Sequence, residues 1–131
     1  MILIDSSGWL EYFGDGLNAD IFAEALFKSK GDIIVPTIVL YEIFKKVLSN
    51  VGEEQALQII GQLKRYRVIP LSEDISLMAA KISHEYKLPM ADSIIYAAAK
   101  VHNAEVWTQD EDFKDLKSVK YIKKKKIRHN R

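Results

Sequence analysis

Four acidic side chains stand where the sequence is otherwise apolar, just after a short hydrophobic run or inside an apolar helical pattern. They are Asp5, Glu42, Asp92 and Asp110. Carboxylates gathered at the edge of a hydrophobic core lose hydration and repel one another, so they must take up protons or share a cation. Carboxylate oxygens are the ligands that magnesium and manganese prefer in proteins. The sequence therefore predicts a site for a divalent metal, provided that the fold brings the four together.

Each of these residues also has a purely structural explanation. Asp5 could cap a helix that begins near Ser7, and Asp92 could stand in a first helical turn because the helix dipole favours an anion there. Glu42 could be an ordinary solvated helix residue, and Asp110 could form an Asx turn. The structural explanations need four separate coincidences in one chain, so the metal hypothesis is favoured.

The elements that must position these side chains alternate along the chain. Short apolar runs predict strands at residues 2–4, 33–35, 68–69, 106–107 and, at an edge of the sheet, 119–122. Amphipathic patterns predict helices near residues 7–13, 20–29, 37–48, 53–65, 75–85 and 91–103. This alternation predicts an α/β protein with three layers, α/β/α, around a mostly parallel central sheet of four to five strands.

Helix starts are predicted from residue types that cap or precede helices. Ser6 and Ser7 are suited to cap the first helix, and Thr37 and Ser72 to cap two later ones. Pro89 suits the entry of the last helix. The carboxyl ends of parallel strands share one edge of a sheet, and sites form there in open sheets. We therefore expect all four acids to meet at that edge, two from strand ends and two from helices.

Composition limits the class of protein. A chain of 131 residues, 48% hydrophobic and 28% charged, suits one compact domain. It has no cysteine, which excludes disulfides and thiolate zinc sites. No apolar run approaches the roughly 20 residues that span a bilayer, and the first five residues carry no basic targeting segment. We expect a protein of the cytoplasm.

The net charge of +1 conceals an uneven distribution. Residues 117–131 carry eight of the 19 lysines and arginines and no acid, so the rest of the chain is acidic. A basic end can attract a polyanion while an acidic body holds cations. A solvated and partly disordered terminus is the simpler interpretation of residues 123–131.

Four spaced segments resemble the motifs of PIN domain nucleases, most closely the VapC-type toxins of bacterial and archaeal toxin–antitoxin pairs. The segment with the first acid is Ile2-Leu3-Ile4-Asp5-Ser6-Ser7, and the second runs from Val35-Pro36-Thr37 to Tyr41-Glu42-Ile43. The third is Met90-Ala91-Asp92-Ser93-Ile94-Ile95 with Ala97-Ala98-Ala99, and the last is Thr108-Gln109-Asp110-Glu111-Asp112-Phe113. Each segment alone is a weak signal. Together they follow the family's order and cover residues 2 to 113.

The resemblance implies a PIN-like nuclease domain over residues 1–122, followed by a basic tail over residues 123–131. It implies a ribonuclease that uses Mg²⁺ or Mn²⁺. The implied catalytic and metal-binding residues are Asp5, Glu42, Asp92 and Asp110. Ser6 and Thr108 are candidates to orient a carboxylate or a water beside them. Asp112 could join the site or only face solvent before Phe113; the second is favoured, so Asp112 is left out of the main set.

The resemblance also implies partners. RNA is the expected substrate, a small antitoxin protein the expected inhibitor, and a homodimer the expected assembly. In the resembled toxins the early helices help to bind the antitoxin. In this chain Trp9, Tyr12 and Phe13 cluster one turn past Asp5, and core packing and a partner surface are equally good explanations of that cluster.

Other functions remain to be weighed. The chain could be a PIN-domain nuclease that processes RNA without an antitoxin, or a catalytically silent RNA-binding PIN module, although the presence of all four acids weighs against the silent module. Phosphate-transfer domains on a similar sheet are disfavoured. A dehalogenase-like site needs an aspartate where Ser7 stands, and a receiver domain needs one after the third strand, where Pro70 and Leu71 stand.

Overall fold

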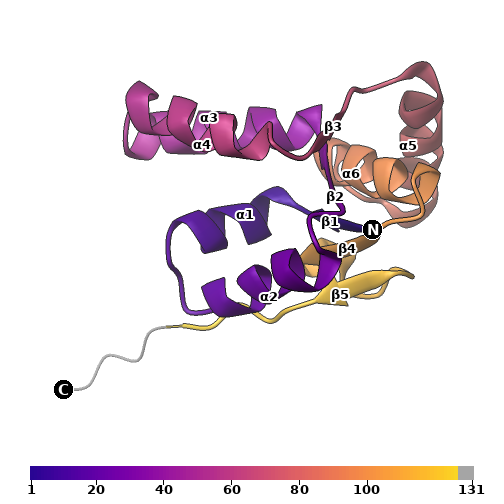
Figure 1. The fold of residues 1–131 in the computed structure, drawn as a ribbon. Helices are drawn as coiled ribbons and strands as arrows, with labels where there is room; N and C mark the ends of the chain where they lie inside the picture. Colours follow the sequence, from indigo (N-terminus) through magenta and orange to yellow (C-terminus); the bar gives the residue numbers. More distant parts are fainter. Residues whose placement is uncertain (127–131) are drawn as a thin grey trace.

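A five-stranded sheet in which all neighbouring strands are parallel forms the centre of the computed structural model, which describes residues 1–126 (Figure 1). The strands lie in the order β3-β2-β1-β4-β5. Their bounds are β1 Ile2–Ile4, β2 Ile33–Pro36, β3 Arg67–Ile69, β4 Glu105–Thr108 and β5 Val119–Tyr121. The predicted parallel sheet is confirmed, and β5 lies at an edge as expected.

Helices cover both faces of this sheet. They are α1 Ser6–Phe13, α2 Ala19–Ser29, α3 Thr37–Asn50, α4 Glu53–Leu63, α5 Glu73–Tyr86 and α6 Met90–Val101, with a short 3₁₀ helix η1 at Glu111–Phe113. Figure 1 shows α1 to α4 on one side of the sheet and α5 and α6 on the other. Right-handed crossovers require this division, because the chain moves outward twice from β1 and then returns past it to β4. Within residues 1–126, no helix is both long enough and apolar enough to cross a membrane.

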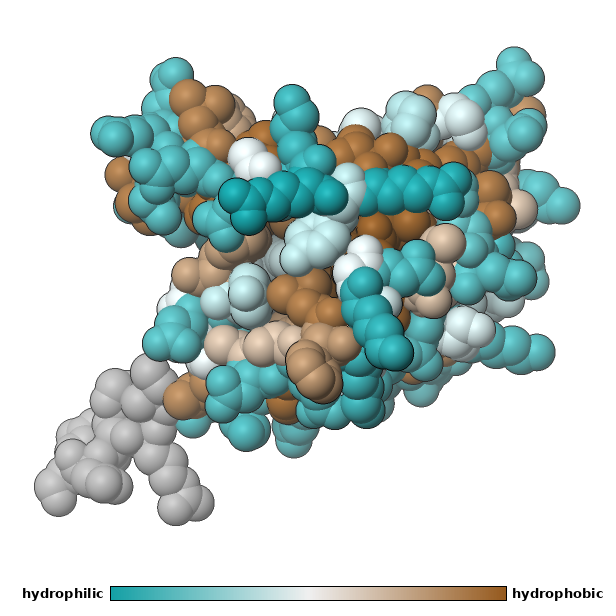
Figure 2. Space-filling view, in the orientation of Figure 1, coloured by the Kyte–Doolittle hydropathy of each residue, from teal (hydrophilic) through white to brown (hydrophobic). Residues whose placement is uncertain are grey.

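The core lies against the central strands. Leu3 and Ile4 of β1 are fully buried, as are Ile34 and Val35 of β2. Strands buried on both faces are apolar at every position instead of alternating, which explains why short continuous runs predicted them correctly. On the face drawn in Figure 2, hydrophilic side chains cover much of the surface and hydrophobic ones are visible between them.

Two of the predicted helix starts need correction. Asp5, and neither Ser6 nor Ser7, is the N-cap of α1, because its carboxylate is the group that accepts a hydrogen bond from the Gly8 amide. Thr37 is the first residue of α3 and makes no side-chain cap. In each case the preceding residue, Asp5 or Pro36, occupies the N-cap position, so the predicted hydroxyl already lies inside the helix.

The other two predicted starts are confirmed. The Ser72 hydroxyl accepts a hydrogen bond from the Ile75 amide at the start of α5, and Pro89 directly precedes α6. At the end of the chain, the Ile122 amide donates to the Thr108 carbonyl at 2.8 Å, and residues 123–126 continue without helix or strand. The rest of the predicted basic tail, residues 127–131, lies outside the described part.

Candidate metal centre

The first and last predicted acids follow neighbouring strands. β1 pairs with β4 so that Ile4 lies opposite Trp107, and the Asp5 amide donates to the Trp107 carbonyl at 3.2 Å. Both strands end at this point. Asp5 and the Thr108–Asp110 segment therefore leave the sheet side by side, at the edge where the sequence predicted a site.

Asp5 is buried and held by three donors. Its Oδ1 accepts from the Ser7 hydroxyl at 2.7 Å and from the Gly8 amide at 3.0 Å, and its Oδ2 accepts from the Thr108 hydroxyl at 2.6 Å. Burial raises the pKa of Asp5 to about 6 in spite of these donors, and the charge of Asp110 adds to the rise. The same carboxylate thus caps α1 and contributes to the acidic group.

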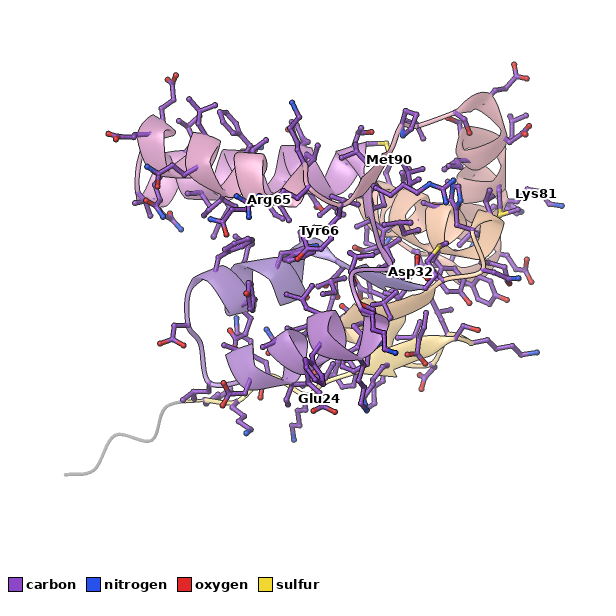
Figure 3. The ribbon with its side chains drawn as sticks, in the orientation of Figure 1. Glu24, Asp32, Arg65, Tyr66, Lys81 and Met90 are labelled. Atoms are coloured by element: carbon purple, nitrogen blue, oxygen red, sulfur yellow. The ribbon has the colours of Figure 1, made fainter. Side chains whose placement is uncertain are left out.

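Three further carboxylates form a cluster beside it. Asp92 stands in the first turn of α6, while Asp110 and Asp112 flank the start of η1, and one oxygen from each of the three lies within 4.8 Å of the others. Burial, together with the charges and hydrogen bonding of Asp110 and Asp112, raises the pKa of Asp92 to about 8. Figure 3 labels Met90, the first residue of α6, two positions before Asp92.

Asp110 also has the turn geometry that was its structural explanation. Its Oδ1 accepts from the Asp112 amide at 2.9 Å, which caps η1. That bond brings the backbone of Asp112 toward Asp110, so the exposed Asp112 joins the cluster. The expectation that Asp112 only faces solvent was therefore incomplete.

Glu42 reaches the same group from α3. The Ser6 hydroxyl donates to its Oε1 at 3.0 Å, and the side chain is half-buried. Burial raises the pKa of Glu42, and the charge of Asp110 again adds to the rise. The negative charge of Asp110 raises the pKa of Asp5, Glu42 and Asp92 alike. The structure therefore brings all four predicted acids together.

The chemistry of this group fits a divalent cation. Among residues 1–126 the ion pairs join the Met1 amine to Asp32 and Lys28 to Glu24, and no lysine or arginine pairs with the acidic group. Crowded carboxylates without a cationic side chain hold protons or bind a metal ion. Their oxygens match the ligand preference of Mg²⁺ and Mn²⁺, which retain several waters and bind through a few carboxylates.

Further residues that the sequence did not assign to the site hold the loop after β4. The Gln109 amide donates to the Ser7 hydroxyl at 3.0 Å. The fully buried Asn18 donates through Nδ2 to Gln109 Oε1 at 2.6 Å and to the Lys123 carbonyl at 3.0 Å. Ser7 could have been found from its place beside Ser6. Asn18 carried no sequence signal, because its partner Gln109 lies 91 positions away.

The aromatic cluster after Asp5 divides between core and surface. Trp9 is buried, with its ring stacked on Phe13 and 5.7 Å from the ring of Tyr66, which Figure 3 labels between α4 and α1. Tyr12 and Phe13 are partly exposed. An apolar groove of about 340 Å³ lies beside them, between α1 and the α3–α4 pair. It is lined by Leu10, Phe13, Gly14, Lys46, Val47, Asn50, Val51, Gln55 and Ile59.

A family model described as "PIN domain" matches residues 2–119, which is most of the chain. No curated protein matches the chain by sequence.

Solved structures share the fold over nearly the full length. A toxin–antitoxin complex from Klebsiella pneumoniae has a TM-score of 0.76 at 24% identity, over 91% of this chain and 95% of that chain. VapBC2 from Rickettsia felis, bound to a DNA fragment from its promoter, has a TM-score of 0.76 at 19% identity, over 92% of this chain and 98% of that chain. VapC20 from Mycobacterium tuberculosis, described as a toxin that cleaves the sarcin–ricin loop, has a TM-score of 0.72 at 16% identity, over 87% of this chain and 93% of that chain.

Proposed function

Since the chain belongs to the PIN domain family, we propose that it is a metal-dependent endoribonuclease that hydrolyses RNA phosphodiester bonds. We further propose that it is the toxin of a VapBC-type toxin–antitoxin pair. The observation that carries the proposal is the meeting of four acids at one edge of the sheet. Two follow β1 and β4, and two stand in α3 and α6, with no cationic side chain paired to them among residues 1–126.

The roles of the residues follow from their positions. Asp5, Glu42, Asp92 and Asp110 would hold Mg²⁺ or Mn²⁺, with Asp112 as a further ligand. When bound, such an ion supplies an activated water at neutral pH and stabilises negative charge on the phosphate. Ser6 would orient Glu42, and Thr108 would orient Asp5, through the hydrogen bonds that they donate.

The proposed partner is a small antitoxin protein. Similar structures are described as toxin–antitoxin and VapBC complexes, which supports such a partner. The apolar groove beside Phe13 and Val47 is suited to an apolar segment of that protein. A homodimer, a cytoplasmic location and a nuclease domain over residues 1–122 with a basic tail are proposed on the family resemblance.

Cleavage of a mixed RNA pool by the purified chain tests the proposal. We expect cleavage with Mg²⁺ or Mn²⁺, none with EDTA, and none with Asp5→Asn or Asp92→Asn. Asp74→Asn is the matched control, because Asp74 also stands in a first helical turn but is exposed on α5, away from the acids. Full cleavage by Asp92→Asn would refute the site. RNA binding without cleavage would favour a silent module.

Metal binding can be measured without activity. A ligand that binds only the folded chain, at about a hundred times its dissociation constant, stabilises it by about 2.7 kcal/mol. We expect Mg²⁺ or Mn²⁺ to raise the melting temperature of the wild-type chain and of Asp74→Asn, and to leave that of Asp92→Asn unchanged. Equal shifts in all three proteins would contradict binding at the cluster.

The antitoxin can be tested separately from the nuclease. We expect a small protein encoded beside this chain to form a stable complex with it and to suppress cleavage. If RNA is cleaved but no neighbouring protein binds, the chain is an RNA-processing nuclease of the same family.

A further inference from the structure

The outer face of α3 differs from the rest of this acidic body. Its inner stripe, Val39, Ile43 and Val47, is buried in the core. The exposed side chains of α3 include one aromatic ring, two lysines and two small polar groups. They are Tyr41, Lys45, Lys46, Ser49 and Asn50. Figure 1 shows α3 packed against α4 in a pair that extends away from the sheet, and these five side chains are exposed among residues 1–126.

A hollow of about 330 Å³ lies on this face and includes Glu42 of the acidic group. Its lining is Tyr41, Glu42, Lys45, Lys46, Ser49 and Asn50. Because Glu42 also accepts from Ser6 beside Asp5, one side chain belongs both to the hollow and to the metal centre. A polymer whose reacting group lies at the acids can therefore continue into the hollow.

The groups in the hollow are available to a ligand. Tyr41 is 59% exposed, and the Lys45 ammonium lies 5.8 Å from the centre of its ring. Among residues 1–126, neither Lys45 nor Lys46 forms an ion pair. Glu42 is the only acid of α3, so these lysines concentrate positive charge in a chain whose first 116 residues are otherwise acidic.

We propose that this hollow binds the single-stranded RNA segment next to the phosphate that is cleaved. The Tyr41 ring stacks on a base, and Lys45 and Lys46 contact backbone phosphates. This combination of an exposed aromatic ring with flanking cations is the usual means of binding single strands without base pairing. A protein partner fits the hollow less well, because its lining is polar and charged, whereas the neighbouring groove, which shares Lys46 and Asn50 with it, is apolar toward α1 and α4. The inference rests on the proposed function in taking RNA as the polymer.

Binding of a labelled single-stranded RNA twelve nucleotides long to the full chain tests the proposal. The chain carries Asp110→Asn to prevent cleavage, and Mg²⁺ is present. We expect Tyr41→Ala to weaken binding about tenfold or more, the range for loss of one base–aromatic stack, and Tyr41→Phe to bind as the parent does. Lys45→Gln and Lys46→Gln should each reduce the slope of log affinity against log salt by about 0.7.

Tyr86→Ala is the matched control, because Tyr86 is also half-exposed and precedes a lysine but lies at the end of α5. Unchanged RNA binding by Tyr41→Ala, or an equal loss with Tyr86→Ala, would overturn the proposal. So would a Tyr41→Ala variant that loses self-association or antitoxin binding while it binds RNA normally. Failure of the wild-type chain to cleave RNA, with Tyr41-dependent binding retained, would refute the proposed activity alone.

Discussion

The Thr108 hydroxyl donates a 2.6 Å hydrogen bond to Oδ2 of Asp5, across 103 positions of the sequence. The same hydroxyl oxygen accepts from the Asp110 amide at 2.9 Å. One short side chain therefore joins the first acid of the site to the backbone of the last. It does so because β1 and β4 are neighbours in the sheet and end at the same level.

Thr108→Val should lower the free energy of unfolding by about 1–3 kcal/mol, because it keeps the shape but leaves a buried carboxylate and an amide without this partner. Loss of the donor should also raise the pKa of Asp5 further, since the bond favours the ionised form. In urea denaturation, the free energy of unfolding of Thr108→Val should therefore fall further below that of the wild-type chain at pH 8 than at pH 5. Thr108→Ser keeps the hydroxyl and should restore most of the loss. Equal stability of the valine and serine variants would contradict this role.

The metal-free chain should become less stable as the pH rises. Asp5 has a pKa of about 6 when folded and 3.8 as a free residue, so the folded state holds a proton that the unfolded state has released. Stability is then lost between these two values, by about 3 kcal/mol for a shift of this size. Denaturation in EDTA from pH 4 to pH 8 measures how the free energy of unfolding changes with pH. Asp5→Asn should reduce the slope up to about pH 6 without abolishing it, because Asp92, with a pKa of about 8, also loses its proton over this range. An unchanged profile would count against the burial of the Asp5 charge.

Asn18→Ala should destabilise the chain by about 1–3 kcal/mol, because Gln109 Oε1 and the Lys123 carbonyl lose their donor. A double-mutant cycle with Gln109→Ala should show a coupling of about 0.5–3 kcal/mol between the two side chains. If Asn18 also holds the loop that carries Asp110, the single variant should need more Mg²⁺ for the same rise in melting temperature. Additive effects in the cycle would mean that the two side chains act independently.

Gly8→Ala should destabilise the start of α1 by about 1–3 kcal/mol through overpacking. A Cβ there would lie 2.6 Å from Ile4 Cγ2 and 2.6 Å from Phe22 Cε1, and both neighbours are fully buried. Gly61→Ala is the control within a helix. It has open space around it on α4 and should stabilise the chain by up to about 1 kcal/mol. Thermal unfolding of both variants measures the difference, and the same sign in both would contradict the packing argument.

Much of the fold was predictable because the central strands β1 and β2 are buried on both faces and therefore consist of short apolar runs. The runs at residues 2–4 and 33–35 correspond closely to β1 and β2. Helix starts were less predictable, because they depend on which of several suitable side chains reaches the free amides. Asp5 caps α1 in place of Ser6 and Ser7, as its structural explanation allowed, by accepting from the Gly8 amide.

The meeting of the four acids followed from their order along alternating strands and helices, since parallel strands share a carboxyl edge. Their supports could not be found in the same way. Asp112 enters the cluster through a local turn at Asp110, and Asn18 contacts Gln109 only because the loop after α1 lies beside the end of β4. Such contacts are set by side-chain positions in three dimensions and leave no periodic pattern.

The position of β1 in the middle of the sheet has a consequence for synthesis. This strand is synthesised first, and it pairs with β2 on one side and with β4 on the other. Ile2 of β1, for example, lies opposite Glu105 of β4. Until β4 has left the ribosome, β1 has an open edge, and Asp5 has neither Thr108 nor Asp110 beside it. Assembly of the acidic site must therefore follow translation of nearly the whole chain. A nascent or prematurely ended chain that stops before β4 thus has no complete site.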